Sequence, residues 1–329
     1  MYISYQMKKK SDIIIQSIHR KRGNGDDEYA KPFLKWAGGK SQLLLEFAER
    51  LPAGLEQGSI TRYVEPFVGG GAMFFYIAQL FPLKESVICD INPELILTWQ
   101  TIKYDVESLI QLLTDLQITY DSLDQNKRMD LFYQVRDSLN KEQKKFDYNT
   151  YHKETIRRAS QLIFLNRTCF NGLFRLNSKG EFNVPFGKYK NPTIVNEKNL
   201  RKVSALLSNT TIIQGDFNQC LQYAGPGAFI YIDPPYRPLN QTSKFTGYSQ
   251  EGFFEKDQIR LSDFFTDAHK TGAQIMLSNS DPKNEDPSDH FFDDIYRDYT
   301  IERVQAKRMI NSDAEKRGSI NELIIRNYQ

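Results

Sequence analysis

The sequence predicts an α/β protein with a mainly parallel sheet flanked by helices, into which a mostly helical segment is inserted. One sign is the run "AFIYI" at 228–232, whose uncharged β-branched and aromatic residues are typical of a strand buried on both faces. Another is that residues 62–81 and 86–100 each have the pattern of a strand followed by a helix. The third is the charged stretch 101–204, where apolar residues recur at helical spacing.

The order of these patterns divides the chain into four parts. Residues 1–30 mix charge clusters with "RGNGDDE" and show no sustained periodicity, so we expect a mobile basic tail there. Residues 31–100 hold the first strands and helices, and residues 101–204 add helical patterns and one hairpin candidate, "FRLNSKGEFNVPFG". Strand signals resume in residues 205–329, at "TTIIQGDF", "AFIYIDPPY" and "AQIMLSNSD". We therefore expect one sheet built from both flanking parts.

Composition excludes several classes of protein. The chain has 329 residues, of which 40% are hydrophobic and 26% charged, as in ordinary globular proteins. No apolar run approaches the roughly 20 residues needed to cross a bilayer, so we expect a cytoplasmic protein. Cys89, Cys169 and Cys220 are widely spaced and there are only 4 histidines, so neither a disulfide framework nor a metal site is predicted.

Positive charge is concentrated in one part of the chain. The formal net charge is only +2. Residues 151–205 nevertheless carry eleven Lys or Arg against three Glu, an excess of eight positive charges. Such an excess is expected of a surface that binds a polyanion, although a solvated helix face would give the same pattern.

A glycine turn, "PFVGGGA", connects the first predicted strand to its helix. Such a turn lets the backbone approach a ligand. It fails the dinucleotide pattern G-x-G-x-x-G, because the last position is Phe74, and "GGKS" lacks the first glycine of a phosphate loop. Asp90 ends the next strand, where a carboxylate can accept ribose hydroxyls. The pair indicates an adenosine-containing cofactor without a pyrophosphate; the alternative is a helix cap at "DINPE".

The strand at 228–232 stops at "DPPY". Asp233 would lie at its carboxyl end, where open α/β sheets bind ligands. The alternative is an ordinary turn, since Asp and Pro are common turn residues. The rest of the chain has to decide between the two.

Six motifs follow one another in a specific order: "KPFLKWAGGK" (31–40), "EPFVGGGA" (65–72), "CDIN" (89–92), "NGLFR" (171–175), "GEFNVPFG" (180–187) and "DPPY" (233–236). Together they resemble the Dam-type DNA adenine methyltransferases, which act on GATC. The match covers nearly everything from Lys31 onward. It implies a class I S-adenosylmethionine-dependent methyltransferase fold, residues 101–204 as a target-recognition domain containing a β-hairpin, and transfer of a methyl group to the N6 amine of adenine in double-stranded DNA.

Three other functions remain open at this point: methylation of adenine in a different DNA sequence, methylation of RNA or of a protein glutamine, and DNA binding without catalysis. "NGLFR" and "GEFNVPFG" argue against RNA or protein substrates, and an intact "DPPY" argues against a pure binding protein. The expected partner is double-stranded DNA. We expect a monomer that is bacterial or phage-encoded and associated with the nucleoid; a cognate restriction endonuclease is left open.

The resemblance assigns catalysis to Asp233, Pro234, Pro235 and Tyr236. The exocyclic amine of adenine is a poor nucleophile because its lone pair is delocalised into the ring. The Asp233 carboxylate and the Pro234 carbonyl would accept its two N–H bonds and stabilise the developing positive charge. Prolines hold that carbonyl in a rigid turn. Tyr236 would stack on the target base after it is flipped out of the duplex.

The resemblance also implies contacts with the cofactor. Trp36 and Lys40 would contact the methionine end of the cofactor, and Phe67, Gly69, Gly70 and Gly71 would line the glycine turn. Asp90 would bind the ribose, Asp216 and Phe217 would lie near the adenine, and Asp233 would lie beside the reacting group. Lys40 supplies a point charge that can meet a carboxylate. "RPLNQTSKFTGYS", after the catalytic motif, is a candidate loop that orders over the flipped base.

DNA recognition is implied for a further set. Arg175 can present a fork to guanine in the major groove, with Leu173 and Pro185 reading the same half of the site. Lys35 and Tyr189 fall where the family contacts the first guanine, Asn171 where it meets the unpaired thymine, and Phe170 where an aromatic ring wedges into the stack. The expected phosphate contacts are Arg157, Arg158, Arg167, Lys179, Lys188 and Lys190.

Overall fold

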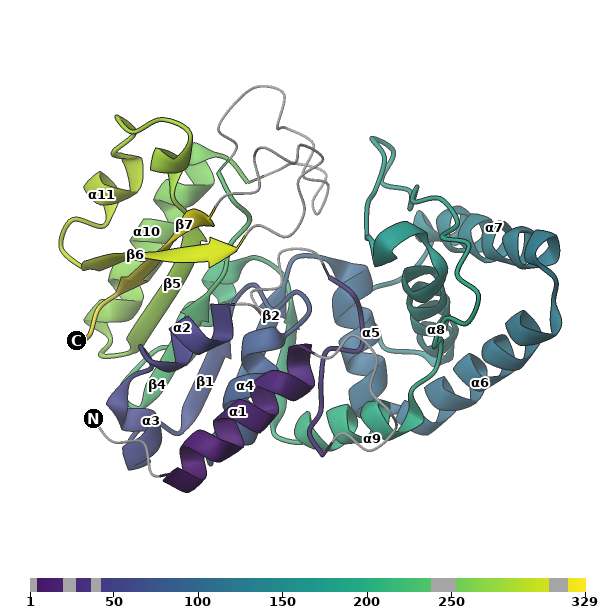
Figure 1. The fold of residues 1–329 in the computed structure, drawn as a ribbon, viewed down its shortest axis with the longest axis horizontal. Helices are drawn as coiled ribbons and strands as arrows, with labels where there is room; N and C mark the ends of the chain where they lie inside the picture. The colour runs from purple at the N-terminus through teal and green to yellow at the C-terminus, as the bar shows by residue number, and fades with distance from the viewer. Residues whose placement is uncertain (1–4, 20–27, 37–42, 238–252, 308–318) are drawn as a thin grey trace.

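The structure is a computed structural model that describes residues 5–19, 28–36, 43–237, 253–307 and 319–329. Its centre is a seven-stranded sheet in the order β3-β2-β1-β4-β5-β7-β6 (Figure 1). The strands are β1 (Arg62–Glu65), β2 (Glu85–Asp90), β3 (Thr210–Gln214), β4 (Ala228–Ile232), β5 (Gln274–Ser280), β6 (Thr300–Lys307) and β7 (Ser319–Arg326). The predicted α/β class with a mainly parallel sheet is confirmed.

Only β7 runs against its neighbours β5 and β6, and the other described strand pairs are parallel. β2 pairs with one edge of β1, and β4 pairs with the other edge, where Val64 lies opposite Ile230. The order of the strands therefore reverses at β1. A ligand crevice of an open α/β sheet lies outside the carboxyl ends at such a reversal of strand order. The carboxyl ends of β1 and β4 carry the "EPFVGGGA" and "DPPY" segments.

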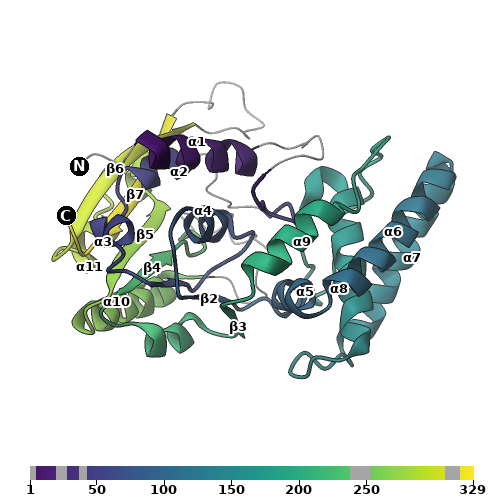
Figure 2. The same cartoon turned by 90° about the horizontal axis from the view of Figure 1, so that it is seen from below.

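Helices cover both faces of the sheet, because successive strand residues point to opposite faces. Phe229 and Tyr231 belong to the apolar cluster that includes α1 (Tyr5–His19) and α4 (Ala72–Leu80), whereas Ile230 and Ile232 belong to the cluster that includes α10 (Glu255–Lys270). Figure 2 shows α1 and α4 on one side of the sheet and α10 on the other. The helices near the sheet are α1 (Tyr5–His19), α2 (Leu44–Ala48), α3 (Ala53–Gln57), α4 (Ala72–Leu80), α5 (Pro93–Tyr104), α10 (Glu255–Lys270) and α11 (Phe291–Ile295).

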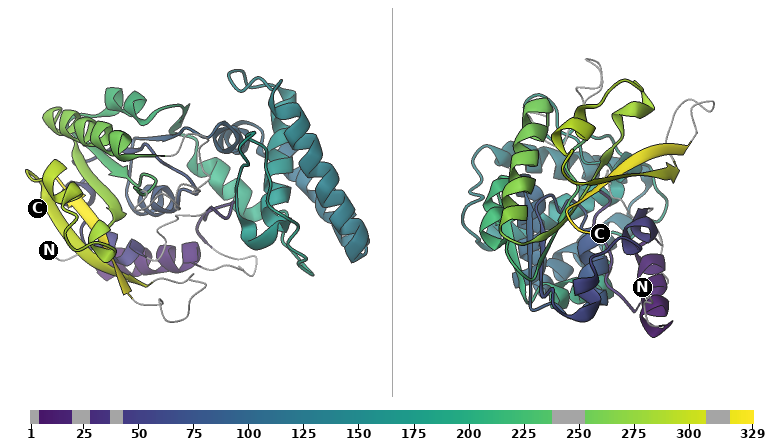
Figure 3. Two further views of the ribbon diagram at one scale, coloured as in Figure 1. Left: turned by 90° about the horizontal axis from the view of Figure 1, so that it is seen from above. Right: turned by 90° about the vertical axis from the view of Figure 1, so that its left-hand side faces the viewer.

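Four further helices lie between β2 and β3 in the sequence: α6 (Val106–Ser122), α7 (Gln125–Gln143), α8 (Lys153–Thr168) and α9 (Glu197–Leu206). Seen from above, α6 and α7 lie together at the end of the molecule away from the sheet (Figure 3). Short 3-10 turns occur at η2 (Phe170–Gly172), η3 (Phe217–Tyr223) and η5 (Pro282–Asn284). Leu176 pairs with Phe182 in an antiparallel bridge, at the position of the predicted hairpin.

The prediction of a mobile tail over residues 1–30 was wrong for residues 5–19, which form α1. Ile14, Ile15 and Ile18 are buried against the apolar cluster that contains α4. The Ser11 hydroxyl lies 2.7 Å from that of Tyr76 on α4. Positions 11, 14, 15 and 18 share one helix face, but the first of them is polar, which hid the helical period in the sequence. No helix in the described ranges is long and apolar enough to span a membrane.

A buried ion pair joins α5 to α8. Arg158 is 0% exposed, and its Nε donates to Glu94 Oε2 at 2.9 Å. The Tyr148 hydroxyl donates to the same carboxylate, and Arg158 Nη1 donates to the Leu139 carbonyl at 3.2 Å. Burial lowers the pKa of Arg158, but the Glu94 carboxylate more than offsets this and the pKa is raised. The pair therefore fixes the inserted helices to a helix that packs on the sheet.

Candidate active site

The turn after β4 is held by hydrogen bonds from two neighbouring elements. Ser278 Oγ on β5 donates to Asp233 Oδ1 at 3.2 Å. Gln258 Nε2 on α10 donates to the Pro235 carbonyl at 3.0 Å. Since both donors are 0% exposed, the turn is fixed from the interior of the protein. Asp233 itself is partly exposed at the carboxyl end of the sheet, as the sequence predicted.

Tyr236 ends this turn, and its hydroxyl is anchored. The hydroxyl donates to Glu322 on β7, with distances of 3.0 and 3.1 Å to the two carboxylate oxygens. Glu322 is buried, whereas Tyr236 is 39% exposed. An anchored hydroxyl and an exposed ring leave an aromatic surface beside Asp233 whose orientation is restricted by the sheet.

Glu65 is a buried acid at the end of β1 that the sequence reasoning did not select. Burial raises the pKa of its carboxyl well above its usual range, and the negative charge of Asp233 adds to this. The Tyr63 hydroxyl donates to Glu65 Oε2 at 2.8 Å and opposes the shift. Its signal in the sequence was an acid directly after the apolar strand "YV" and before Pro66.

The glycine turn and Asp90 contact each other. Asp90 Oδ2 accepts the Gly69 N–H at 3.0 Å, and Oδ1 accepts the Asn92 N–H at 2.9 Å. Burial raises the pKa of Asp90 despite these bonds, which favour its charged form. Gly71 precedes α4 with φ +71°, and a Cβ there would lie 2.8 Å from the Trp99 ring. Glycine is therefore required at this position by both backbone conformation and space.

Aromatic rings gather beside the carboxyl ends of β1 and β3. The Phe67 and Phe217 ring centroids are 5.4 Å apart, and Phe253 meets Phe67 edge-on at 5.7 Å. Phe253 follows a segment without strand or helix periodicity, which is why sequence reasoning missed it. Asp216, which was predicted near the cofactor's adenine, is bound by Arg260, whose Nη2 lies 3.1 Å from both carboxylate oxygens.

A second group of predicted residues meets beside Trp36, which packs on the glycine turn. Trp36 lies within 3.0 Å of where a Cβ on Gly69 would be. Lys35 beside it is exposed, with its Nζ 5.1 Å from the Tyr189 ring centroid. The Tyr189 hydroxyl accepts the Asn171 N–H at 3.0 Å. Three residues that are far apart in the sequence therefore form one patch.

Asn166, at the end of α8, positions this patch, and sequence reasoning did not select it. Its Oδ1 accepts the Lys35 N–H at 2.9 Å, and its Nδ2 donates to the Lys35 carbonyl at 2.8 Å. Nδ2 also lies 3.0 Å from the Gly172 carbonyl. This buried amide therefore joins the segment before the glycine turn to the "NGLFR" segment.

Exposed apolar side chains continue from this patch. Phe170 is 52% exposed and Leu173 is 36% exposed, and the Phe170 N–H donates to the Pro185 carbonyl at 2.8 Å. Arg175 is exposed, and its Nε donates to Asn183 Oδ1 at 2.8 Å. One side of the guanidinium is thus held by the hairpin, which directs the remaining N–H groups.

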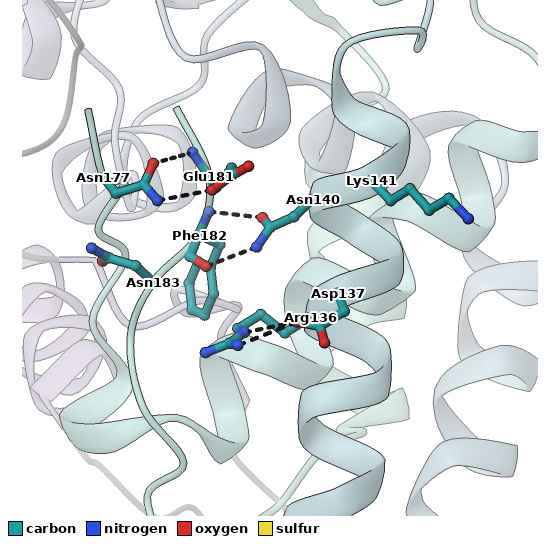
Figure 4. Close-up of a pocket in the computed structure, with 8 residues that line it drawn as sticks. All are labelled: Arg136, Asp137, Asn140, Lys141, Asn177, Glu181, Phe182 and Asn183. Atoms are coloured by element: carbon teal, nitrogen blue, oxygen red, sulfur yellow. Dashed lines mark hydrogen bonds and ion pairs between the residues drawn. The ribbon is translucent and has the colours of Figure 1, made fainter. Parts of the chain in front are cut away.

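The hairpin that carries Arg175 is fixed to α7 by one side chain. Figure 4 shows Asn140 directed at the backbone of Phe182, and both residues line a cavity of about 380 Å³. Asn140 Nδ2 donates to the Phe182 carbonyl at 3.0 Å, and the Phe182 N–H donates to Asn140 Oδ1 at 2.8 Å. The Asn140 amide makes the two backbone hydrogen bonds that a neighbouring strand would otherwise make. It therefore fixes the position of this edge of the hairpin.

Comparison with known proteins identifies the family. The model of the D12 class of N6 adenine-specific DNA methyltransferases matches residues 36–310, which is most of the chain. The chain belongs to this family. The predicted family, enzyme activity and class I methyltransferase fold are thereby confirmed.

Relatives cover the D12-class chain almost completely. The type II methyltransferase M.MjaIII of Methanocaldococcus jannaschii is 48% identical over 91% of this chain and 99% of its own length. The type II methyltransferase M1.LlaDCHI of Lactococcus lactis is 37% identical over 91% of this chain and 95% of its own. The DNA adenine methylase of Haemophilus influenzae is 34% identical over 89% of this chain and 92% of its own.

Three of the phosphate contacts expected for this D12-class enzyme are engaged within the protein. Arg158 is buried in the ion pair with Glu94. Arg167 donates to the Phe33 carbonyl at 2.6 Å, and burial lowers its pKa to about 10. Arg157 pairs with Glu142. The prediction was wrong for Arg158 because charge in a sequence does not reveal burial; Lys179, Lys188 and Lys190 are exposed as expected.

Two predictions fall outside the described residues of the D12-class chain. Lys40, expected beside the methionine end of the cofactor, lies in the undescribed range 37–42. The candidate loop after the catalytic motif falls, apart from Arg237, within the undescribed range 238–252. Both remain predictions.

Proposed function

We propose that this D12-class enzyme transfers a methyl group from S-adenosylmethionine to the N6 amine of adenine in double-stranded DNA, within GATC, after flipping the adenine out of the helix. The observation that carries the proposal is the turn from Asp233 to Tyr236. Buried donors hold it at the carboxyl end of the sheet, and it combines a carboxylate with an exposed ring. These are the groups that an extruded adenine requires.

The chemistry follows from the acceptors of this turn. The Asp233 carboxylate and the Pro234 carbonyl accept the two N–H bonds of the amine, which directs the nitrogen lone pair away from the ring. The carboxylate also stabilises the positive charge that develops on the nitrogen. The Pro235 carbonyl already accepts a bond from Gln258, so it serves to hold the turn. The ring of Tyr236 stacks on the base.

The cofactor site is supported by the residues around the glycine turn. Asp90 retains acceptor capacity after its two backbone bonds, because each carboxylate oxygen has two lone pairs. Phe67 and Phe253, which are partly exposed and pack on the buried Phe217, supply an aromatic surface of the kind on which an adenine ring can stack. We propose that these residues, with Trp36, bind S-adenosylmethionine, which supplies an electrophilic methyl group when it is bound. Asp216 would bind the cofactor through the acceptor positions of its carboxylate that Arg260 does not use.

We propose residues 101–204 as the target-recognition domain. The patch of Lys35, Asn171 and Tyr189 would read the first half of the site. Arg175, with Leu173 and Pro185, would read the guanine of the other half, and the exposed ring of Phe170 would wedge into the base stack. The support is that all these side chains except the partly buried Tyr189 are exposed and lie on segments joined by Asn166 and Asn140.

The direct test is transfer of labelled methyl groups from S-adenosylmethionine. Substrates are a GATC duplex, duplexes with each base changed in turn, and single-stranded RNA. We expect labelled N6-methyladenine only in the GATC duplex. Labelling of another duplex sequence would contradict the assigned specificity but would still support the proposed reaction. Labelling of RNA alone would contradict the proposed substrate.

Replacing Arg175 with alanine should relax sequence discrimination. A bidentate contact to guanine contributes roughly 1–3 kcal/mol, so preference for GATC over a duplex changed at that guanine should fall about 5- to 150-fold. The measurement is the ratio of kcat/KM for the two duplexes. The matched control is Lys179→Ala, because Lys179 is exposed on the same hairpin and has no assigned base. It should weaken binding to both duplexes equally; an unchanged ratio for Arg175→Ala would contradict the assignment.

A further inference from the structure

A chain of hydroxyl groups runs from the interior of the sheet to Asp233. Tyr231 Oη on β4 lies 3.0 Å from Ser278 Oγ on β5, and Ser278 Oγ lies 3.2 Å from Asp233 Oδ1. Ser278 is 0% exposed and Tyr231 is 2% exposed. The two strands are parallel neighbours, with Ile232 opposite Leu277. The two hydroxyl groups of this hydrogen-bonded chain therefore lie inside the sheet, away from the surface that would meet DNA.

The direction of both hydrogen bonds can be assigned. A carboxylate only accepts, so Ser278 uses its one proton to donate to Asp233. The Tyr231 hydroxyl must then be the donor to Ser278. Burial raises the pKa of Tyr231 well above its usual range, and the negative charge of Asp233 adds to this, so the phenol keeps its proton. Hydrogen bonds are thus donated in one direction, from Tyr231 to Ser278 and from Ser278 to Asp233.

We propose that Ser278 is a positioning residue for methyl transfer and that Tyr231 holds Ser278 in place. The donor on Oδ1 restricts the rotation of the Asp233 side chain and so holds the carboxylate in the orientation that meets the amine. The inference rests on the proposed role of Asp233. Small errors in the position of a reacting group can cost large factors in rate, and the backbone of the turn does not restrict the carboxylate rotation by itself.

The charged surroundings give the donor a second effect. Glu65 on β1 and Tyr231 on β4 both interact electrostatically with Asp233, and Tyr236 interacts with Tyr231. Because burial raises the pKa of Glu65 well above its usual range, Glu65 favours its neutral form beside Asp233. A protonated Asp233 would be a weaker acceptor for the N–H bond of the amine than the carboxylate is. A hydroxyl that donates to the carboxylate favours the charged form.

The test compares Ser278→Ala, Tyr231→Phe and Ser278→Thr in single-turnover methyl transfer to the GATC duplex across a pH series. A hydrogen bond to a charged group contributes 1.5–3 kcal/mol, so Ser278→Ala should slow transfer about 10- to 100-fold. The acid limb of its rate profile should move to higher pH. Tyr231→Phe should show a smaller loss in the same direction. Ser278→Thr, which keeps the hydroxyl, should restore the profile.

Controls separate positioning from folding and from the proposed function. Ser160→Ala removes a buried hydroxyl on α8 that donates to the Arg157 carbonyl, and it should leave the pH profile unchanged. Dissociation constants for DNA and S-adenosylmethionine should stay within about twofold in Ser278→Ala and Tyr231→Phe. If Asp233→Ala abolishes transfer while Ser278→Ala and Tyr231→Phe retain the wild-type rate and profile, this inference is overturned. If Asp233→Ala transfers normally, the proposed function itself fails.

Discussion

Asp233→Ala is expected to slow methyl transfer by at least about 100- to 1000-fold, the cost of removing one preorganised electrostatic group from an active site. The substitution removes the acceptor for one N–H bond of the amine and the charge that stabilises the methylated nitrogen. Binding should change little, because affinity for DNA comes mainly from its phosphates. The measurement is the single-turnover rate with labelled S-adenosylmethionine, beside titrations of DNA and cofactor binding.

The matched control for this prediction is Asp286→Ala. Asp286 is an exposed acid in the segment after β5, where it accepts bonds from Ser288. Asp286→Ala changes the net charge by the same amount as Asp233→Ala and should retain the wild-type rate. Loss of DNA binding in Asp233→Ala, with an unaltered circular dichroism spectrum, would contradict the assigned role, and so would an unchanged rate.

Arg158→Met should produce the largest loss of stability, about 3–5 kcal/mol in the free energy of unfolding, as expected when one partner of a buried ion pair is removed. The Glu94 carboxylate, 6% exposed, would keep the Tyr148 hydroxyl as a partner but lose its counter-charge. The measurement is unfolding in urea followed by circular dichroism. Arg157→Met is the control, because this neighbouring arginine is exposed and its pair with Glu142 should contribute at most about 1 kcal/mol.

A double variant tests the reason for that loss. Glu94→Gln together with Arg158→Met removes both charges from the buried site. It should be more stable than Arg158→Met alone, because no uncompensated charge is left. Equal stability of the double and single variants would show that packing, and not charge, accounts for the effect.

The strands were predictable where both faces are buried. Residues 228–232 coincide with β4, since no polar face interrupts the apolar run. The motif residues around the sheet were found for a related reason: turns at strand ends require glycine, proline and short polar side chains, which stand out in an apolar context. The position of Asp233 at the end of β4 follows directly from these two patterns.

The supporting residues could not be predicted, because their roles depend on partners that are distant in sequence. Ser278 is 45 residues from Asp233, and Glu322 is 86 residues from Tyr236. An isolated Ser or Glu in a strand carries no sign of such a contact. Arg158 shows the same difficulty in reverse, since it lies in the most basic stretch of the chain and yet is completely buried. Burial is a property of tertiary packing that charge counting does not detect.

The pairing of β2 with β3 has a consequence for chimeric enzymes. The chain leaves the sheet after Asp90 and returns at Thr210, and Asp90 and Gln214 are register partners on adjacent strands. Because the two strands are parallel, Thr210 lies beside Ser86, so the segment leaves at the carboxyl ends of the strands and returns at their amino ends. An inserted segment must therefore also carry the chain back along the length of the sheet. A segment of another length could be grafted there while the strand register is kept, provided that it brings an arginine to Glu94, which stays behind on α5. Compatibility between a grafted recognition segment and this catalytic core would then depend on that ion pair and on the bonds of Asn166 and Arg167 to the Lys35 and Phe33 backbone.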